Sequence, residues 1–291
     1  MFEFCADPST LGSGAWMACY LTTAKHMALY WSVLIVFALL ACAGPLALAM
    51  GLLGAVARRS SFFAFRWFGW LYTSMVRGVP DTIFFLFVPL ALDQLFEYLR
   101  HRTLCPEQTG AVWVGNDFIV CQAAKLPLGP SPEWVHDTYG FILAVIAFTI
   151  VFGAFAANVI HGALNSVPKG QIETARAYGM TPRQTFRRIL LPQMWVYALP
   201  GLSNIWMILI KATPLLFLLG IEDVVYWARE LGSSKTARFS DYPHPDWRVY
   251  YFGGLIIFYL FLTWISQFTL SRLTARLTKG QASLAGKGAG L

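Results

Sequence analysis

Long apolar segments dominate the chain, and polar residues gather in the shorter stretches between them. A helix needs about 20 mostly apolar residues to cross the hydrocarbon core of a bilayer. Five segments meet this requirement, and they cover residues 26–57, 62–99, 139–161, 193–219 and 249–270. We therefore predict an all-α integral membrane protein with five transmembrane helices, forming a single transmembrane domain over residues 1–291.

The second segment carries a helix-breaking motif at its centre, Arg77-Gly78-Val79-Pro80-Asp81. Proline removes a backbone donor and kinks a helix, so this motif suits either a kink or a turn between two crossings. With five crossings, the basic clusters around Arg58, Lys169 and Arg272 share one side of the membrane, where Glu173 is the one acid. This is the positive-inside pattern. We therefore predict one long kinked crossing, with the N-terminus outside and the C-terminus inside.

The connecting segments complete the predicted topology. Two outer loops cover residues 99–138 and 221–248, a cytoplasmic loop covers 162–192 between the third and fourth spans, and a flexible tail covers 278–291. The first outer loop carries Cys105 and Cys121. An oxidising compartment would favour a disulfide between them, but the spacing alone leaves a bridge and two free thiols equally open.

Composition agrees with a membrane protein and argues against other classes. Hydrophobic residues make up 57% of the chain and charged residues 13%, against about 25% charged residues in an average soluble domain. The net charge of +7 does not indicate nucleic-acid binding, because the basic residues alternate with apolar spans and form no single patch with stacking aromatics.

The chain shows no sequence pattern for catalysis or for a bound cofactor. The string from Gly280 to Gly288 resembles a phosphate-binding loop, but its glycine spacing is one residue too long and no Ser or Thr follows Lys287. No Cys/His set has zinc-finger spacing, and no nucleophile lies in a convincing arrangement with a base. We expect no catalytic site, no metal and no cofactor bound by this chain.

The cytoplasmic loop 162–192 has the pattern of two short helices at the membrane surface. Pro168 suits the first turn of a helix, and Gly179 stands where a C-terminal cap favours a left-handed residue. Thr181, with Gln184 three residues later, forms a capping-box pattern that begins a second helix. Pro192 is expected to end that helix and to start the next span. Such a helix pair could dock in a groove of a partner protein or lie on anionic lipid headgroups, and the residues alone do not decide.

A resemblance to a known family enters at this loop. Glu173-Thr174-Ala175, Gly179 and Ile189-x-Leu191-Pro192 resemble the EAA loop of the permease subunits of binding-protein-dependent ABC importers, with Thr174 in place of the first alanine as the one departure. Other segments resemble the polar amino acid branch of these permeases, of the histidine/lysine/arginine/ornithine type. These segments are Val76–Pro80, Gln171–Ala177, Gln184–Pro192, Ala198–Asn204 and Lys211–Thr213, and the similarity covers about residues 21–277.

The resemblance implies a type I importer permease in the bacterial inner (cytoplasmic) membrane. Such a subunit moves polar amino acids, with basic ones favoured here, from the periplasm to the cytoplasm by alternating access. The implied partners are ABC ATPase subunits that bind ATP and Mg, a second permease that is either identical or different, a periplasmic substrate-binding protein and the lipid bilayer. The loop would hold a coupling helix that docks in the ATPase through Pro168, Glu173, Thr174, Ala175, Gly179, Ile189, Leu191 and Pro192.

Polar residues within the predicted spans are candidates for the translocation path, because such groups are costly in lipid and usually face a cavity or a partner. They are Arg77, Asp81, Asn204, Lys211 and Thr213. Arg77 and Asp81 are four residues apart and could instead pair with each other across the break at Pro80. The resembled branch reads Lys-Asp-Thr where Ala212 stands here, so a basic substrate would lack a matching acid. Each polar group could also serve only as an interhelical hydrogen bond.

The alternative is an ion-coupled secondary amino acid transporter or a channel that acts without an ATPase. Such a protein would normally show internal repeats and a membrane carboxylate for coupling. The chain has no convincing repeat, and Asp81 is the one acid well inside a predicted span. The EAA-like loop therefore favours the importer permease.

Overall fold

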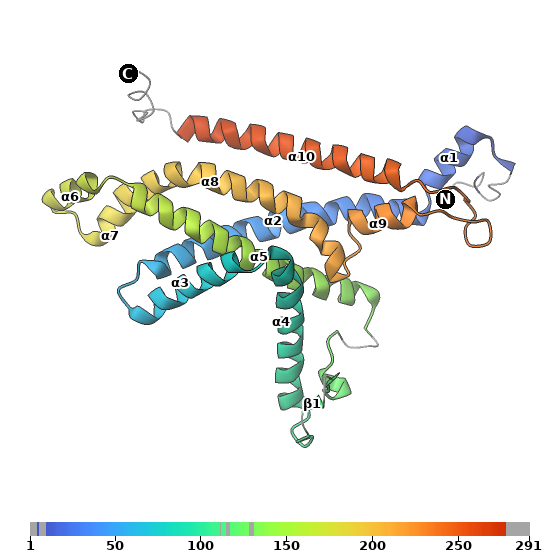
Figure 1. The fold of residues 1–291 in the computed structure, drawn as a ribbon, viewed down its shortest axis with the longest axis horizontal. Coiled ribbons are helices and arrows are strands. Elements are labelled where there is room, and N and C mark those ends of the chain that lie inside the picture. Colours follow the sequence, from blue (N-terminus) through green and yellow to red (C-terminus); the bar gives the residue numbers. More distant parts are fainter. Residues whose placement is uncertain (1–4, 6–9, 111, 115–116, 128–130, 278–291) are drawn as a thin grey trace.

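The computed structural model describes residues 5, 10–110, 112–114, 117–127 and 131–277, and these are almost entirely helical (Figure 1). The tail predicted at 278–291 lies outside the described residues. Long helices α2 (Ala24–Arg58), α5 (Glu133–Ser166), α8 (Leu191–Ala212) and α10 (Arg248–Leu277) run in roughly the same direction, and α4 (Asp81–Leu104) stands across them (Figure 1). The shorter elements are α1 (Ser13–Leu21), α3 (Phe63–Gly78), β1 (Trp113–Val114), β2 (Asp117–Phe118), α6 (Lys169–Ala177), α7 (Pro182–Thr185) and α9 (Val224–Gly232).

Five helical segments among the described residues are long and apolar enough to cross a membrane, which confirms the predicted number. They cover Ala24–Arg58, Thr82–Leu104, Glu133–Ser166, Pro182–Leu219 and Arg248–Leu277. Most extend a few residues beyond the predicted limits, because helices continue past the hydrophobic stretch into polar residues. The loop expected at 221–248 also contains a helix, α9. Which end of the chain faces which side of the membrane stays a prediction.

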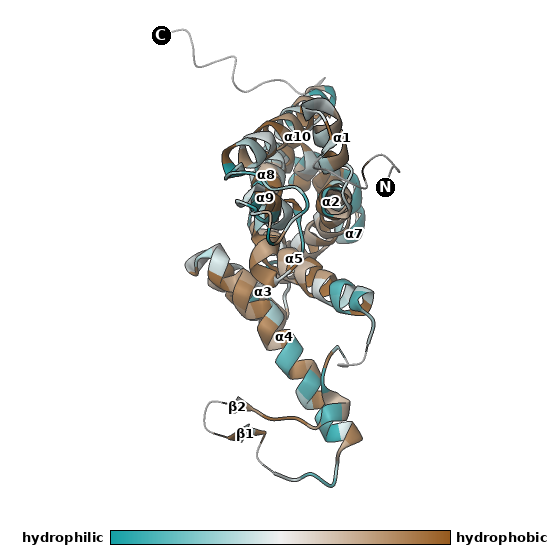
Figure 2. Cartoon of the chain, turned by 90° about the vertical axis from the view of Figure 1, so that its right-hand side faces the viewer, coloured by the Kyte–Doolittle hydropathy of each residue, from teal (hydrophilic) through white to brown (hydrophobic). Residues whose placement is uncertain are grey.

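The single kinked crossing predicted over 62–99 is wrong in form, because two separate helices, α3 and α4, meet there at a corner (Figure 1). Val79 has φ −115° and ψ 140°, and Pro80 has ψ 133°, so both backbones are extended. The proline ring disfavours the helical region for the residue before it, which explains why the chain breaks instead of bending. Figure 2 shows that α4 is apolar on the α3 side of its length and more polar towards β1 and β2.

A seam of small residues holds α2 against α5. A Cβ at Gly51 would lie 2.6 Å from the Cβ of Ala156, and one at Gly54 would lie 2.9 Å from the Cβ of Ala157. Tyr72 from α3 packs into the same seam and donates a 2.6 Å hydrogen bond to the carbonyl of Ile150. Small residues let helix backbones approach closely in a membrane, so this seam forms the rigid centre of the fold.

The end of the bundle next to α9, here called the α9 end, is fastened by side chains from several segments. A disulfide joins Cys5 to Cys19 of α1. The hydroxyl of Tyr20 lies 3.0 Å from Nε2 of His244 and accepts a 3.2 Å hydrogen bond from the hydroxyl of Tyr251 on α10. These contacts attach α1 and the loop before α10 to the start of α10.

The long loop after α4 is fastened along one side of that helix. Cys105 and Cys121, the pair that spacing left open, form a disulfide. One turn earlier, Nδ1 of His101 accepts the backbone N–H of Cys121 at 3.0 Å, and a further turn back Oε1 of Glu97 accepts that of Leu126 at 2.9 Å. The loop also carries the antiparallel pair β1 and β2. The loop is therefore an ordered extension of α4, fixed to it by a disulfide and two hydrogen bonds.

Candidate functional site

The first candidate region is the surface hairpin, defined as residues 169–190. Its first helix, α6, is terminated by a cap at Gly179, whose φ is +77°. The N–H of Gly179 donates to the carbonyl of Arg176 at 2.9 Å, and that of Met180 donates to Ala175 at 3.0 Å. These two bonds form a Schellman motif, which requires a left-handed residue that glycine adopts without strain. The predicted cap at Gly179 is confirmed.

The second helix begins with the predicted capping box. The side-chain oxygen of Thr181 accepts the N–H of Gln184 at 3.3 Å, and the N–H of Thr181 donates to Oε1 of Gln184 at 2.9 Å. Pro182 occupies the first turn of α7, where its missing donor costs no hydrogen bond. Each cap satisfies backbone groups that would otherwise lack partners, so the sequence fixes the hairpin locally.

The predicted end of the second helix at Pro192 is wrong, because the helix continues through it into α8 as one stretch from Pro182 to Leu219. A π-helical turn at Phe186–Leu190 precedes the proline, and the N–H of Leu191 donates to the carbonyl of Phe186, five residues back. The wider turn accommodates a residue that has no N–H to donate and whose ring would clash in a regular helix.

The exposed face of the hairpin does not include every residue of the family motif. Ala175 is 5% exposed and packs inwards, whereas Glu173, Thr174 and Gly179 are exposed. Tyr178 is 84% exposed and was missed from the sequence, although its place directly before the cap could have singled it out. The remaining motif residues have mixed exposure, with Pro168 and Pro192 exposed and Ile189 and Leu191 half-buried.

Apolar side chains fix the hairpin to the helices behind it. Ile172 and Phe186 pack on a buried cluster that includes Ile160, Leu190 and Met194. Gln193 of α8 also donates to the side chain of Gln171 on α6. A force applied to the hairpin is therefore transmitted to α5 and α8.

The second candidate region is a polar groove of about 640 Å³ between α8 and α10. From α8 it is lined by Pro200, Ser203, Asn204, Met207 and Lys211, which share one helical face, and from α10 by Gln267, Leu270, Ser271, Thr274 and Ala275. Lys211 is the one charged side chain among these lining residues, and its exposed ammonium makes no ion pair within the described part of the chain. The groove therefore presents a single positive charge among neutral hydrogen-bonding groups.

The structure separates the predicted path residues. Asn204 and Lys211 face the same groove, as their spacing of two helical turns allows. Thr213 is fully buried and lies 2.9 Å from the hydroxyl of Tyr259 on α10, so it is an interhelical contact. The side chains of Arg77 and Asp81 lie outside the described residues. The α10 residues that line the groove were not predicted from the sequence, although Gln267, Ser271 and Thr274 form a polar stripe at helical spacing.

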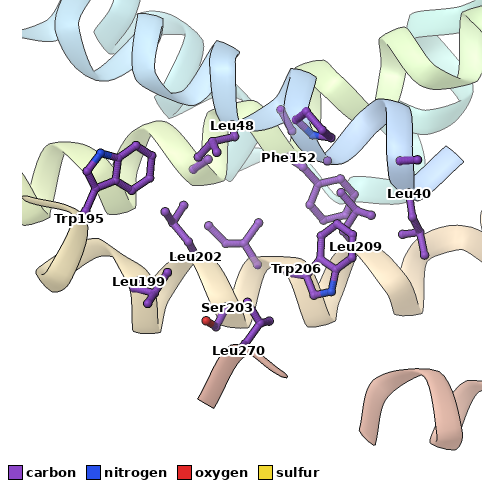
Figure 3. Close-up of a pocket in the computed structure, with 16 residues that line it drawn as sticks. Leu40, Leu48, Phe152, Trp195, Leu199, Leu202, Ser203, Trp206, Leu209 and Leu270 are labelled. Atoms are coloured by element: carbon purple, nitrogen blue, oxygen red, sulfur yellow. The ribbon is translucent and has the colours of Figure 1, made fainter. Parts of the chain in front are cut away.

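An apolar pocket of about 420 Å³ adjoins the groove, and α2, α5 and α8 enclose it (Figure 3). Leu40, Leu48, Phe152, Leu202 and Trp206 are among its lining residues. Figure 3 shows Ser203 next to Leu270 of α10, and both residues also line the polar groove. A polar solute would leave its hydrogen bonds unsatisfied in the apolar pocket. The groove is therefore chemically better suited to a polar solute than this pocket.

Asp223 is a fully buried carboxylate at the α9 end, outside the membrane-spanning segments. Its Oδ1 caps α9 by accepting the N–H groups of Val225 at 3.1 Å and Tyr226 at 2.9 Å. Burial raises the pKa of the Asp223 carboxyl to about 6, although the two cap hydrogen bonds act in the opposite direction. The helix α9 packs on both α2 and α10, so Asp223 caps the helix that contacts these two at the α9 end.

Comparison with known families gives one match that covers most of the chain. The profile of the family described as "Binding-protein-dependent transport system inner membrane component" matches residues 43–280. This range contains the surface hairpin, both sides of the polar groove and the α2–α5 seam.

Curated relatives agree with that match. The histidine/lysine/arginine/ornithine transport system permease protein HisQ of Salmonella typhimurium is 33% identical over 81% of this chain and 86% of its own length. The arginine ABC transporter permease protein ArtQ of Escherichia coli is 28% identical over 82% of this chain and 90% of its own. The nopaline transport system permease protein NocQ of Agrobacterium fabrum is 30% identical over 67% and 72%, respectively.

Solved structures share the fold. An amino acid ABC transporter crystallised with histidines superposes with a TM-score of 0.57 at 21% identity, covering 88% of this chain and 98% of the other. The inward-facing MetNI methionine ABC transporter superposes with a TM-score of 0.55 at 16% identity, covering 92% and 100%.

Proposed function

The chain belongs to the family of binding-protein-dependent transport system inner membrane components, and from this premise we propose that it imports amino acids with cationic side chains, or their opine relatives. It is a multi-pass inner-membrane permease of an ABC amino acid importer. The proposal concerns its cargo, the residues that handle that cargo and the residues through which ATP hydrolysis acts.

The polar groove has side chains suited to a cargo that carries a carboxylate. Lys211 supplies one positive charge, and Asn204, Gln267 and Ser271 supply neutral hydrogen-bonding groups around it. An amino acid carboxylate matches an ammonium group. No carboxylate among the described residues lines the groove, so the cationic end of the cargo needs an acid from elsewhere. A second permease subunit, identical or different, would supply it across the pathway.

The surface hairpin supports coupling to a separate ATPase that binds ATP and Mg. Its exposed residues Glu173, Tyr178 and Gly179 form the face that a partner would contact, while Ala175 holds the helix from behind. Closure of two ATPase subunits would push on this face, and the packing of Ile172 and Phe186 would pass the push to α5 and α8. The groove beside α8 would then open to one side and close to the other, which is alternating access.

The observation that carries the proposal is the fixed geometry of the hairpin, and Gly179 gives a matched pair of variants that tests it. At φ +77° valine is strained, whereas asparagine tolerates a left-handed conformation. We expect Gly179→Val to abolish ATP-dependent uptake of arginine in proteoliposomes containing the complete importer, and to release the ATPase during purification. Gly179→Asn should keep the ATPase bound and retain most of the uptake.

The same assay contains the outcomes that would overturn the proposal. Normal uptake and normal ATPase retention in Gly179→Val would show that the hairpin is not the coupling element. Arginine uptake by this chain without ATP or its partners would instead support a secondary transporter. Uptake of neutral but not cationic amino acids would overturn the cargo assignment alone.

A further inference from the structure

A basic recess of about 520 Å³ lies on the surface hairpin where the chain enters its fourth span. It is lined by Thr181, Arg183, Gln184, Arg187 and Arg188. Thr181 and Gln184 satisfy one another in the capping box. The capping box uses only the acceptor oxygens of these two side chains, so their hydroxyl and amide groups remain neutral donors. The charged donors at the recess are the three guanidinium groups, all of which are on exposed side chains.

These guanidinium groups have no anion of their own. Across the residues that the structure describes, no carboxylate lies within ion-pair distance of Arg183, Arg187 or Arg188. Glu173, the one acid between residues 162 and 192, lies on the other helix of the hairpin and forms no ion pair within the described part of the chain. Three like charges at one recess repel one another unless an anion joins them, and the planar guanidinium matches the geometry of phosphate.

The recess lies at the depth where a bilayer carries phosphate. The helical stretch that begins at Pro182 is 38 residues long, which corresponds to about 57 Å, whereas the hydrocarbon core is about 30 Å thick. The end near Pro182 carries the three arginines of the recess, whereas the end near Leu219 is apolar. Charged side chains are costly in hydrocarbon, so the excess length lies among the headgroups, in the first turns at the Pro182 end. The opposite side of the same turns is apolar, since Phe186 and Leu190 pack on the helices behind them.

We propose that Arg183, Arg187 and Arg188 bind the phosphate of an anionic phospholipid and so anchor the surface hairpin to the bilayer. The face suited to a protein partner is elsewhere, on α6 around Glu173 and Tyr178. The π-turn contributes directly, because it holds Arg187 and Arg188 at the same recess as Arg183. The lipid site requires neither cargo nor nucleotide, so it is independent of the proposed transport function.

The test uses the assembled importer in detergent, titrated with phosphatidylglycerol or with phosphatidylcholine and followed by native mass spectrometry. We expect wild type to retain phosphatidylglycerol preferentially. The triple variant Arg183→Gln/Arg187→Gln/Arg188→Gln should lower the apparent affinity about fivefold for each guanidinium removed, or roughly a hundredfold in total. A parallel titration with inorganic phosphate distinguishes the sources, because an anchor for lipid needs the acyl chains and should bind free phosphate far more weakly.

A matched variant distinguishes lipid binding at this recess from general attraction to surface charge. Arg66→Gln/Arg272→Gln/Arg276→Gln removes the same charge from exposed residues of α3 and α10. It should leave phosphatidylglycerol binding within about twofold of wild type, since surface attraction is long-ranged but a site is local. Equal losses in both triple variants would overturn the proposal, as would unchanged lipid binding in the recess variant. Loss of the ATPase from the recess variant with lipid binding retained would reassign the recess to a protein contact.

Discussion

The α2–α5 seam and the α8–α10 groove are opposite ways of placing two helices side by side. In the seam, glycine and alanine leave no space, and 56% of the apolar span of α5 is buried. Across the groove, polar side chains face one another over about 640 Å³, and only 6% of the apolar span of α10 is buried within the chain. Small residues thus mark the pair of helices that packs closely, and medium polar residues mark the pair that leaves a groove between its members.

The largest expected effect comes from breaking the seam. Any side chain at Gly51 would put its Cβ 2.6 Å from that of Ala156 and 3.1 Å from its carbonyl carbon. Because backbone cannot move aside, we expect Gly51→Leu to cost about 3 kcal/mol or more and to prevent recovery of monodisperse protein. Gly253→Leu on α10 is the matched control, since no atom of the described residues lies within 4 Å of a Cβ there. Similar melting temperatures for the two variants would contradict the distinction between the regions.

The next effect concerns Asp223 at the α9 end, which lies apart from both regions. Its pKa is about 6 in the folded chain, above the usual value near 4, so the folded state binds the proton more tightly. The free energy of unfolding should therefore rise as the pH falls from about 7 to about 4, by an amount on the order of 2 kcal/mol. Asp223→Asn keeps an oxygen that can cap α9 but removes the charge.

Thermal unfolding of wild type and Asp223→Asn across this pH range checks the sign. The variant should be more stable than wild type at pH 7 and should show a flatter pH profile. A wild-type profile that loses stability on acidification, with Asp223→Asn removing that loss, would mean that the carboxylate is stabilised rather than penalised by its surroundings.

A smaller difference is expected between single hydrogen bonds of the two regions. Tyr72 donates to Ile150 within the seam at 2.6 Å, whereas Tyr259 pairs with Thr213 beside α10 at 2.9 Å. We expect Tyr72→Phe to destabilise the protein by about 1 kcal/mol. Tyr259→Phe should cost less, because Thr213 keeps its 3.0 Å bond to the carbonyl of Ile210. Denaturant or thermal unfolding of both variants measures the difference, and the reverse order would contradict it.

The smallest effect on stability should come from the groove itself. Lys211 is exposed and makes no ion pair among the described residues, so Lys211→Gln should change the free energy of unfolding by less than about 0.5 kcal/mol. Uptake of arginine by the complete importer should nevertheless fall about tenfold, the effect of losing about 1.4 kcal/mol of charge pairing. Lys211→Arg keeps the charge and should restore much of the rate. Unchanged uptake in Lys211→Gln would exclude this residue from the path.

Local signals in the sequence were sufficient for much of the surface hairpin. Gly179 and the pair Thr181 and Gln184 act on backbone groups within a few residues, so their roles could be predicted without knowing the fold. Pro192 could not, because the response to a proline depends on whether the chain breaks, as it does at Pro80, or widens by a π-turn. Within the π-turn, Phe186 and Leu190 pack on α5 and α8, a tertiary contact that no local pattern shows.

The groove was only half predictable for a similar reason. Asn204 and Lys211 lie on one helix, so their common face follows from their spacing. The partners across the groove, Gln267 and Ser271, depend on how α10 lies against α8, which no local pattern determines. The same limit applies to Ala175, which belongs to the family motif but faces the protein interior.

The π-turn at Phe186–Leu190 also fixes how many residues the chain must have between the hairpin and the membrane. A π-turn holds one residue more than a regular helix of the same rise. Deleting one residue inside the turn would therefore restore a regular helix with nearly the same rise and direction. Deleting one residue from α8 with the turn kept would instead shift everything before it by one position, which is a rotation of about 100° around the helix axis. Glu173 and Tyr178 would then point in a new direction while every local cap remained intact. In this segment, the number of residues determines the direction in which the hairpin points, whatever the identity of those residues.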